Sequence, residues 1–404
     1  MKCTRKITEN LVWVGADDRR QSLFENIFPI PGGVAYNSYL LLDEKTALMD
    51  TVDFAVSRQF FENLSEELAD RKLDYLVMHH MEPDHGATVE ALVRLYPEVT
   101  LVGNEKTMQI LGQFFPRLVG VKTLLVKEGD TLKLGAHSLT FLMAPMVHWP
   151  ETMVSYDPCG GVLFSGDAFG AFGALNGNLF VDETDIRGDW LAEARRYYSN
   201  IVGKYGMQVQ GLLKKAAALD IQIVCPLHGP VWRSQVKVLL HFYDLWSRYE
   251  PEERAVTICY CSMYGNTEQV ASALALALAE GGSGRIAMLD LSRCDVSYAL
   301  SEVFRCSHLV LASPTYNGEI YPKMLALLQD MQSHSVQNRT VALVENGTWY
   351  PVSGKLMGEL LGGMKNMTVL DPMISLKSAP APGQEQQVGG LADAILASMD
   401  VKNL

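Results

Sequence analysis

The chain has 404 residues, which is long enough for two or three domains of ordinary size. Hydrophobic residues make up 48% of it and charged residues 20%, a balance typical of a packed globular enzyme rather than a disordered chain. The formal net charge of −12 argues against broad binding to nucleic acids, whose phosphate backbone requires a basic surface.

No apolar stretch reaches the length needed to cross a bilayer, and the N-terminal segment lacks the apolar run of a signal peptide. The seven cysteines are odd in number and form no CxxC pair, so neither a disulfide framework nor a zinc ribbon is indicated. We therefore expect a cytoplasmic protein with reduced thiols that binds no membrane and no nucleic acid.

The first 250 residues alternate short β-rich segments with helical patterns. Short apolar runs bounded by turn or polar residues predict strands at 38–42, 46–50, 73–78, 139–144, 162–165 and 221–225. Apolar residues at helical spacing predict helices at 56–69, 88–96 and 190–218. The charged segment RYEPEER at 248–254 interrupts this pattern and is the predicted linker.

From residue 255 onwards, apolar strands alternate regularly with helical segments. The predicted strands are 255–260, 286–290, 308–313, 340–345 and 373–377. Continuous apolar strands that alternate with helices imply a parallel sheet covered on both faces. The sequence therefore predicts two domains, 1–250 and 254–404, of which the second is doubly wound.

In the first domain, seven side chains that can bind metal follow apolar, strand-like runs. They are His80, Glu82, Asp84 and His85 in the segment HHMEPDHG, and further along the chain His148, Asp167 and His228. Loops at strand ends commonly carry functional sites. A single histidine is more often structural, which is our interpretation of His79, His137, His241, His308 and His334. Seven such side chains in one domain predict a metal site.

The spacing resembles that of the metallo-β-lactamase fold, whose signature is HxHxDH followed by a later His, a bridging Asp and a final His. The resemblance covers about residues 1–250. Glu82 stands where hydrolases of that fold have a second histidine. Carboxylate oxygens shift the preference from zinc towards harder metals such as iron.

The pattern HxExDH with later His, Asp and His is similar to that of the flavodiiron family. This resemblance implies two irons and assigns these side chains to them: His80, Glu82 and His148 to one iron, Asp84, His85 and His228 to the other, and Asp167 to both. The three carboxylates and a bridging hydroxide would balance the four positive charges of two ferrous ions.

Three polar loops follow strands of the second domain. The first, CSMYGNTEQ at 261–269, precedes a helix whose backbone N–H groups can bind an anion, although such a loop can also be an ordinary helix cap. It lacks the GK[ST] of a nucleotide-hydrolysing P-loop. The others, at 313–322 and 345–354, are Gly-rich and contain aromatic residues. All three leave the carboxyl ends of strands, where open parallel sheets bind ligands.

Three such loops in this order resemble flavodoxin over about residues 255–400, which implies FMN, with Tyr316 and Trp349 flanking its ring. Tyr264 departs from the usual T/SxTGxT phosphate loop, but the form SMYGNT fits flavodiiron proteins. The candidate FMN contacts are Ser262, Met263, Tyr264, Gly265, Asn266, Thr267, Pro314, Thr315, Tyr316, Asn317, Gly318, Asn346, Gly347, Thr348 and Trp349.

The implied fold class is α/β: an N-terminal metallo-β-lactamase-like αββα sandwich and a C-terminal flavodoxin-like, doubly wound, parallel five-stranded sheet. The implied activity is reduction of dioxygen to water, of nitric oxide to nitrous oxide, or of both, at the two irons. Electrons would pass through FMN. Because no CxxC pair is present, we expect a separate donor such as rubredoxin or a reduced flavin-type carrier.

The resemblance also implies a head-to-tail homodimer, or a dimer of such dimers, that places the FMN of one chain beside the irons of the other. Two alternatives remain open. One is a dinuclear zinc hydrolase of the lactamase fold, and the other is an FMN electron carrier or sensor that reduces no gas. No motif distinguishes a preference for dioxygen from one for nitric oxide.

Overall fold

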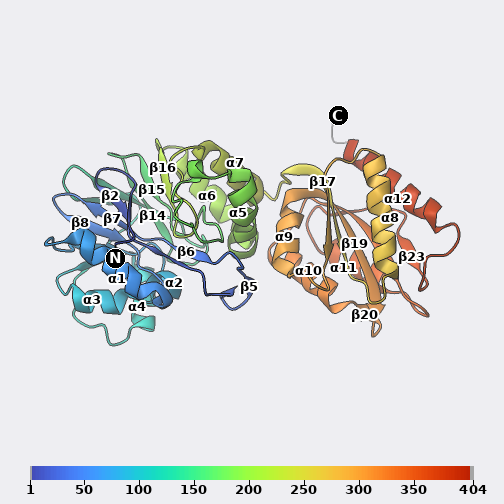
Figure 1. The fold of residues 1–404 in the computed structure, drawn as a ribbon, viewed down its shortest axis with the longest axis horizontal. Coiled ribbons are helices and arrows are strands. Elements are labelled where there is room, and N and C mark those ends of the chain that lie inside the picture. Colours follow the sequence, from blue (N-terminus) through green and yellow to red (C-terminus); the bar gives the residue numbers. More distant parts are fainter. Residues whose placement is uncertain (1, 401–404) are drawn as a thin grey trace. The chain divides into compact units, whose positions relative to one another are not determined.

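The computed structural model describes residues 2–400 and shows two compact units, which divide between Asp244 and Leu245 (Figure 1). Met1 and residues 401–404, at the outer ends of the predicted domains, lie outside the described residues. The predicted linker follows this division, and its last two residues already belong to strand β17 (Glu253–Tyr260). In the described part of the chain, no helix is long and apolar enough to span a membrane.

Two β-sheets form the centre of the first unit. The larger has seven strands in the order β1-β2-β7-β8-β9-β10-β11, and the smaller has five in the order β12-β13-β14-β15-β16. The strands of the larger sheet are β1 (Arg5–Lys6), β2 (Leu11–Trp13), β7 (Tyr39–Leu42), β8 (Thr46–Met49), β9 (Tyr75–Val77), β10 (Thr100–Gly103) and β11 (Thr123–Leu125). Those of the smaller sheet are β12 (Thr131–Lys133), β13 (Ser138–Met143), β14 (Met153–Asp157), β15 (Val162–Phe164) and β16 (Ile223–Cys225). Two separate pairs join β3 (Ala16–Asp18) to β6 (Val34–Tyr36) and β4 (Leu23–Phe24) to β5 (Phe28–Pro29).

Helices cover the two sheets from both sides, which gives the predicted αββα arrangement (Figure 1). They are α1 (Ser57–Leu68), α2 (Pro83–Gly86), α3 (Val89–Leu95), α4 (Glu105–Phe114), α5 (Leu191–Tyr197), α6 (Gly206–Ala216) and α7 (Val236–Ser247). Helix α1 buries Phe60, Leu64 and Leu68, which recur every four residues and form one apolar stripe. Strand β8 is buried along its whole length because the sheet is covered on both faces.

The six strands predicted in this unit are all present, with ends that differ by no more than two residues. The predicted helices 56–69 and 88–96 are present as α1 and α3. The helix predicted at 190–218 is present as a helical stretch of mixed type that begins with α5 and ends with α6. A π-helical segment (Tyr198–Val202) and a 3-10 turn (Gly203–Tyr205) separate α5 from α6. Gly203 in this interval lowers the helix propensity, and the π turn marks a local break in α-helical geometry.

The second unit contains the predicted parallel sheet. Its strand order is β18-β17-β19-β21, with β22 and β23 both beside β21 and the short β20 antiparallel to β19. The strands after β17 are β18 (Ile286–Asp290), β19 (Cys306–Tyr316), β20 (Glu319–Ile320), β21 (Thr340–Asn346), β22 (Thr368–Val369) and β23 (Ile374–Leu376). The five predicted strands correspond to β17, β18, β19, β21 and β23. This order is that of flavodoxin-like folds.

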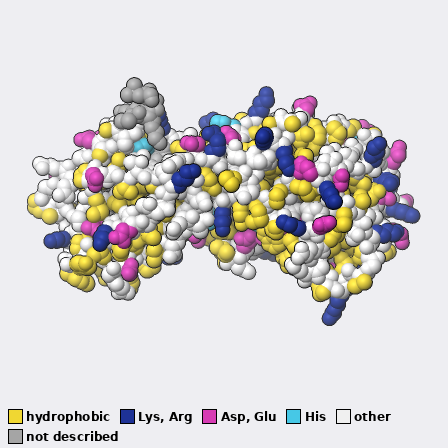
Figure 2. Space-filling view, turned by 180° about the vertical axis from the view of Figure 1, so that it is seen from behind, with side chains coloured by type: hydrophobic (Ala, Val, Ile, Leu, Met, Phe, Trp, Pro, Cys, Tyr) yellow, Lys and Arg dark blue, Asp and Glu magenta, His cyan; other side chains and the backbone are white. Residues whose placement is uncertain are grey.

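Helices cover both faces of this sheet. Helices α8 (Asn266–Glu280) and α12 (Gln384–Asp400) pack together on one face, whereas α9 (Val296–Arg305), α10 (Pro322–Ser333) and α11 (Ser353–Gly362) cover the other (Figure 1). Strand β21 is buried throughout as a result. Because β17, β19 and β21 are parallel neighbours, their carboxyl ends lie along one edge. On the molecular face shown in Figure 2, acidic and basic side chains are interspersed.

Candidate functional site

The seven predicted metal-binding side chains converge in the first unit. Each lies at the end of a strand or on a loop that follows one: the loop after β9 and helix α2, the β13–β14 loop, and the segments after β15 and β16. Their candidate ligand atoms form two groups, each within 4.8 Å, which are His80, Glu82, His148 and Asp167, and Asp84, His85 and His228. The first group is mostly buried and the second is fully buried.

Asp167 lies between the two groups, and its two carboxylate oxygens face different histidines. Its Oδ2 is 3.0 Å from His148 Nε2 and 3.4 Å from His80 Nε2. Its Oδ1 is 3.0 Å from His85 Nε2 and 3.6 Å from His228 Nε2. This is the arrangement expected of a carboxylate that bridges two metal ions.

One further carboxylate completes each half of the cluster. Glu82 Oε2 lies 3.2 Å from Nε2 of both His80 and His148. Asp84 Oδ2 lies 3.2 Å from His228 Nε2 and 3.4 Å from His85 Nε2. Each half therefore presents two imidazole nitrogens and two carboxylate oxygens to a common centre, a mixed N/O donor set that suits iron.

Three buried carboxylate oxygens of the cluster have no hydrogen-bond partner. Both carboxylate oxygens of Asp84 and Oδ1 of Asp167 are buried and accept no hydrogen bond. Leaving a buried charged group unsatisfied costs about 1–3 kcal/mol or more. Cations between the histidines and carboxylates would satisfy these oxygens, so the residues present fit a two-metal centre.

The electrostatics of the cluster lead to the same conclusion. Burial alone lowers the pKa of His85, but the carboxylates of Asp84 and Asp167 outweigh it and raise that pKa to about 9. Burial likewise lowers the pKa of His148, and its hydrogen bonds to Asp167 and Glu82 raise it to about 9. In the absence of a metal, His85 and His148 thus take up protons that balance the carboxylates. Metal ions would displace these protons.

Outer partners orient two of the histidines. His80 Nδ1 donates to Glu151 Oε1 at 2.8 Å, and His228 Nδ1 donates to the carbonyl oxygen of Ala35 at 2.9 Å. Both hydrogen bonds leave Nε2 free to bind metal. Glu151 was not predicted from the sequence. Its position three residues after His148, in HWPET, was the available signal, but spacing alone does not show that it contacts His80.

His79 lies outside the cluster, as expected of a structural histidine. Its Nδ1 lies 2.6 Å from Asp50 Oδ2 and its Nε2 2.7 Å from Ser155 Oγ, and all three side chains are buried. Asp50 Oδ1 also accepts from the backbone N–H groups of His79 and His80. These hydrogen bonds fix the backbone on which His80 is carried.

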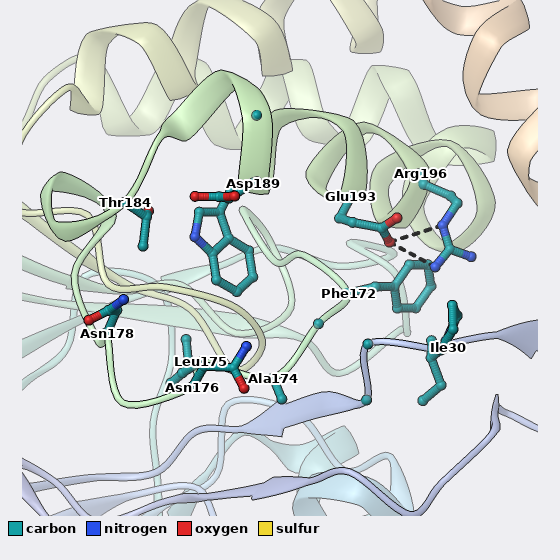
Figure 3. Close-up of a pocket in the computed structure, with 16 residues that line it drawn as sticks. Ile30, Phe172, Ala174, Leu175, Asn176, Asn178, Thr184, Asp189, Glu193 and Arg196 are labelled. Atoms are coloured by element: carbon teal, nitrogen blue, oxygen red, sulfur yellow. Dashed lines mark hydrogen bonds and ion pairs between the residues drawn. The ribbon is translucent and has the colours of Figure 1, made fainter.

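A separate cavity of about 480 Å³ lies beside this region (Figure 3). None of the seven cluster residues lines it. The ring of Phe172 forms part of its wall and contacts Tyr197, whose ring in turn contacts the imidazole of His228. Glu193 and Arg196, which also line it, form an ion pair with each other at 2.7 Å. The cavity is therefore separated from the cluster by aromatic side chains.

The predicted flavin loops leave the neighbouring strands β17, β19 and β21. In the first loop, Ser262 Oγ accepts from the backbone N–H of Gly265, whose φ of +92° favours glycine. Helix α8 begins at the next residue, Asn266. The turn therefore presents the N–H groups at the start of a 15-residue helix at the edge of the sheet.

Hydrogen bonds connect the flavin loops to one another. Asn346 Nδ2 donates to Thr267 Oγ1 at 3.3 Å and to the carbonyl oxygen of Ser378 at 2.9 Å. Thr315 Oγ1 accepts from the backbone N–H groups of Val352 and Ser353. The loop at Ser378, which the sequence analysis did not single out, thus belongs to the same assembly.

Large aromatic side chains are exposed at this edge. Tyr264 and Trp349 are each 90% exposed, and Tyr316 is 43% exposed. Exposed aromatic side chains gathered at a ligand-binding edge indicate a surface that a bound molecule covers. The structure thus brings together the predicted loops, while the contact of each residue with FMN stays a prediction.

Comparison with known proteins identifies the family. A family model described as ODP family beta lactamase matches residues 34–229, which include the whole metal cluster. The nitric oxide reductase of Moorella thermoacetica is 30% identical over 377 residues, which are 93% of each chain. The solved rubredoxin oxygen:oxidoreductase of Desulfovibrio gigas is 28% identical, with a TM-score of 0.90 over 99% of each chain.

This chain belongs to the flavodiiron family. The crystal structure of the flavodiiron protein of Giardia intestinalis shares its fold, with a TM-score of 0.93 and 24% identity over 100% of this chain and 99% of that one. The chain spans 66% of the length of flavorubredoxins that it matches. The predicted family and α/β fold class are confirmed.

Proposed function

We propose that this flavodiiron chain reduces dioxygen to water, nitric oxide to nitrous oxide, or both, at a two-iron centre that receives electrons through FMN. The observation that carries the proposal is the placement of Asp167, whose two oxygens each face one histidine pair. The names of two relatives support it: one is a nitric oxide reductase and the other a rubredoxin oxygen:oxidoreductase.

In this proposal each half of the cluster holds one iron. The ligands are His80, Glu82 and His148 for one iron, Asp84, His85 and His228 for the other, and Asp167 for both. Two ferrous ions and reduced FMN would supply the four electrons that convert dioxygen into two waters, or the two electrons that convert two nitric oxide molecules into nitrous oxide and water. The protein would hold the two metals at fixed positions beside each other and limit the access of water to them.

The exposure of the proposed ligands supports a route for the gas. The side chains of His80, His85 and His228 are 0% exposed, whereas those of Glu82 and Asp84 are 13% and 12% exposed. His148 is 9% exposed. We therefore infer that the substrate approaches between the two carboxylates, while the buried histidines hold the opposite side of the centre.

The second unit would hold FMN at the carboxyl ends of β17, β19 and β21. Its phosphate would lie at the start of α8, and Tyr316 and Trp349 would flank its ring. We propose a diiron domain over 1–250 and an FMN domain over 254–404, with one refinement: residues from Leu245 onwards pack with the second unit.

We further propose a cytoplasmic enzyme that is a head-to-tail homodimer or a dimer of such dimers. The electrons would come from a donor such as rubredoxin or a reduced flavin-type carrier. The name of the Desulfovibrio gigas relative includes rubredoxin, which supports this choice.

Metal and flavin analysis tests the proposed cofactors. Protein purified from iron-sufficient cells should contain about two iron ions and one FMN per chain, and little zinc, because carboxylate donors favour iron. Elemental analysis and flavin absorbance measure both. Activity that is complete with zinc and no iron would support the hydrolase alternative. Reversible flavin reduction without uptake of dioxygen or nitric oxide would support the electron-carrier alternative.

Gly347→Ala tests the flavin loop after β21. A Cβ at Gly347 would lie 2.7 Å from the backbone Cα of Pro351, so the loop must shift. Overpacking of this kind typically costs about 1–3 kcal/mol, and we expect FMN affinity to fall about tenfold or more. Flavin fluorescence titration of the apoprotein measures this. The matched control is Gly389→Ala in α12, where a Cβ meets nothing within 4 Å. Equal FMN affinity in the two variants would contradict the proposed site.

A further inference from the structure

The two halves of the metal cluster differ in what contacts the Nδ1 atoms of their histidines, which face away from the cluster. In the first half, His80 Nδ1 contacts a carboxylate, Glu151 Oε1, at 2.8 Å. In the second half, His228 Nδ1 contacts the uncharged carbonyl oxygen of Ala35, and His85 Nδ1 is buried without a hydrogen-bond partner. Of these three histidines, His80 is thus the one whose Nδ1 contacts a charged side chain, that of Glu151.

Glu151 is held firmly in this position. Its side chain is 0% exposed, and Oε1 also accepts from the backbone N–H of Met81 at 2.9 Å. Its own carbonyl oxygen accepts from Asn104 Nδ2 at 2.6 Å. One residue therefore ties together the loop that carries His80 and the loop that carries His148.

The second carboxylate oxygen of Glu151 makes this placement costly. Oε2 is buried and accepts no hydrogen bond. A neutral acceptor could satisfy His80 and Met81 equally well without burying a negative charge. The carboxylate is therefore better explained by an effect of its charge on His80 than by packing.

We propose that Glu151 is a positioning residue that makes the metal held by His80, Glu82 and His148 the more electron-rich of the two. The inference rests on the proposed two-metal centre. Each half has two histidines and one carboxylate of its own and shares Asp167, so the directly binding residues are balanced in charge. A carboxylate at Nδ1 raises the basicity of Nε2 and strengthens its bond to a metal. The iron in this half should therefore be oxidised first.

Metal titration of half-site variants tests the effect on affinity. His228→Ala should weaken the Asp84 half and leave the His80 half to be measured, and His148→Ala should do the converse. The full-length apoprotein is titrated with Co²⁺ under anaerobic conditions, and the visible absorbance of bound Co²⁺ is followed. Adding Glu151→Gln should weaken Co²⁺ binding about 10–100-fold in the His228→Ala background and leave it unchanged in the His148→Ala background.

The control for loss of one negative charge is Glu128→Gln. Glu128 is a partly exposed residue of the same unit that pairs with Lys215, and its replacement should leave both titrations unchanged. Unchanged affinity of the His80 half in Glu151→Gln, or equal weakening of both halves, would overturn the inference. If wild-type protein takes up fewer than two Co²⁺ per chain, the two-metal centre itself is wrong.

Two further readouts separate charge from shape. In the iron-loaded full chain, Glu151→Gln should raise the reduction potential of the iron that is oxidised first. A redox titration monitored by electron paramagnetic resonance measures this potential. Glu151→Asp keeps the charge, so the Co²⁺ affinity of its His80 half should lie closer to wild type than that of Glu151→Gln. An unchanged potential, or the reverse order of affinities, would show that Glu151 acts by shape alone.

Discussion

Replacing Asp167 with alanine should remove most of the iron and abolish gas reduction, while the FMN content stays normal. The two oxygens of this carboxylate face different halves of the cluster, so no other residue can take its place in both. Its loss also removes the one negative charge that both histidine pairs share. Displacement of a reacting centre by about 1 Å can cost 100-fold in rate, and we expect at least that loss of turnover.

A matched control separates metal binding from stability. Asp157 is equally buried in the same unit and hydrogen-bonds a structural histidine, His137, at 2.8 Å. Asp157→Ala should destabilise the unit but keep iron and turnover in the molecules that fold. Iron content, flavin absorbance and consumption of nitric oxide and dioxygen are measured on both variants. Normal gas reduction by Asp167→Ala would show that it is not the bridging residue.

A fragment that starts at Leu245 and contains the rest of the chain should fold, bind FMN and accept electrons, yet reduce no nitric oxide. Its sheet and helices form a hydrophobic core of their own, in which Val270, Leu274 and Leu278 of α8 pack with Leu391 and Ile395 of α12. It contains none of the seven cluster residues. Substantial production of nitrous oxide by this fragment would place the chemistry at the flavin and contradict the diiron proposal.

Adding the separate first unit to this fragment should restore little activity. Tethering in one chain, together with assembly into a dimer, gives a flavin and a metal site an effective concentration of roughly millimolar, which free fragments at micromolar concentration lack. Mixed fragments that recover most of the activity of the intact chain would show that neither the tether nor the proposed dimer is needed.

The start of the fragment matters because of Arg339. This guanidinium is buried, and burial lowers its pKa to about 10. Its N–H groups donate to backbone carbonyl oxygens, among them that of Tyr249 at 2.7 Å. A fragment starting at residue 254 lacks this acceptor and should be less stable to urea by about 1–3 kcal/mol than one starting at Leu245. Equal stability of the two fragments would show that the other acceptors of Arg339 Nη1, the carbonyl oxygens of Gln337 and Asn338, or water make up for the lost carbonyl.

Local sequence determined the elements and the candidate ligands, because both depend on short-range patterns. Apolar runs of four to eight residues bounded by turns identify strands whatever their neighbours are. Parallel strands bring their carboxyl ends to one edge, so the alternation of strands and helices was enough to group the loops after β17, β19 and β21. The seven candidate metal-binding side chains were identified in the same way, since each follows an apolar run.

Tertiary structure decided the features that depend on partners distant in sequence. Strand β14 was missed because its buried Ser155 and Asp157 make it look only partly apolar, and their partners are His79, 76 residues away, and His137, 20 residues away. Likewise, no local pattern shows that Glu151 reaches His80, or that the two oxygens of Asp167 face different histidines. A buried polar group is satisfied by whatever the fold places beside it, and short-range patterns carry no information about that neighbour.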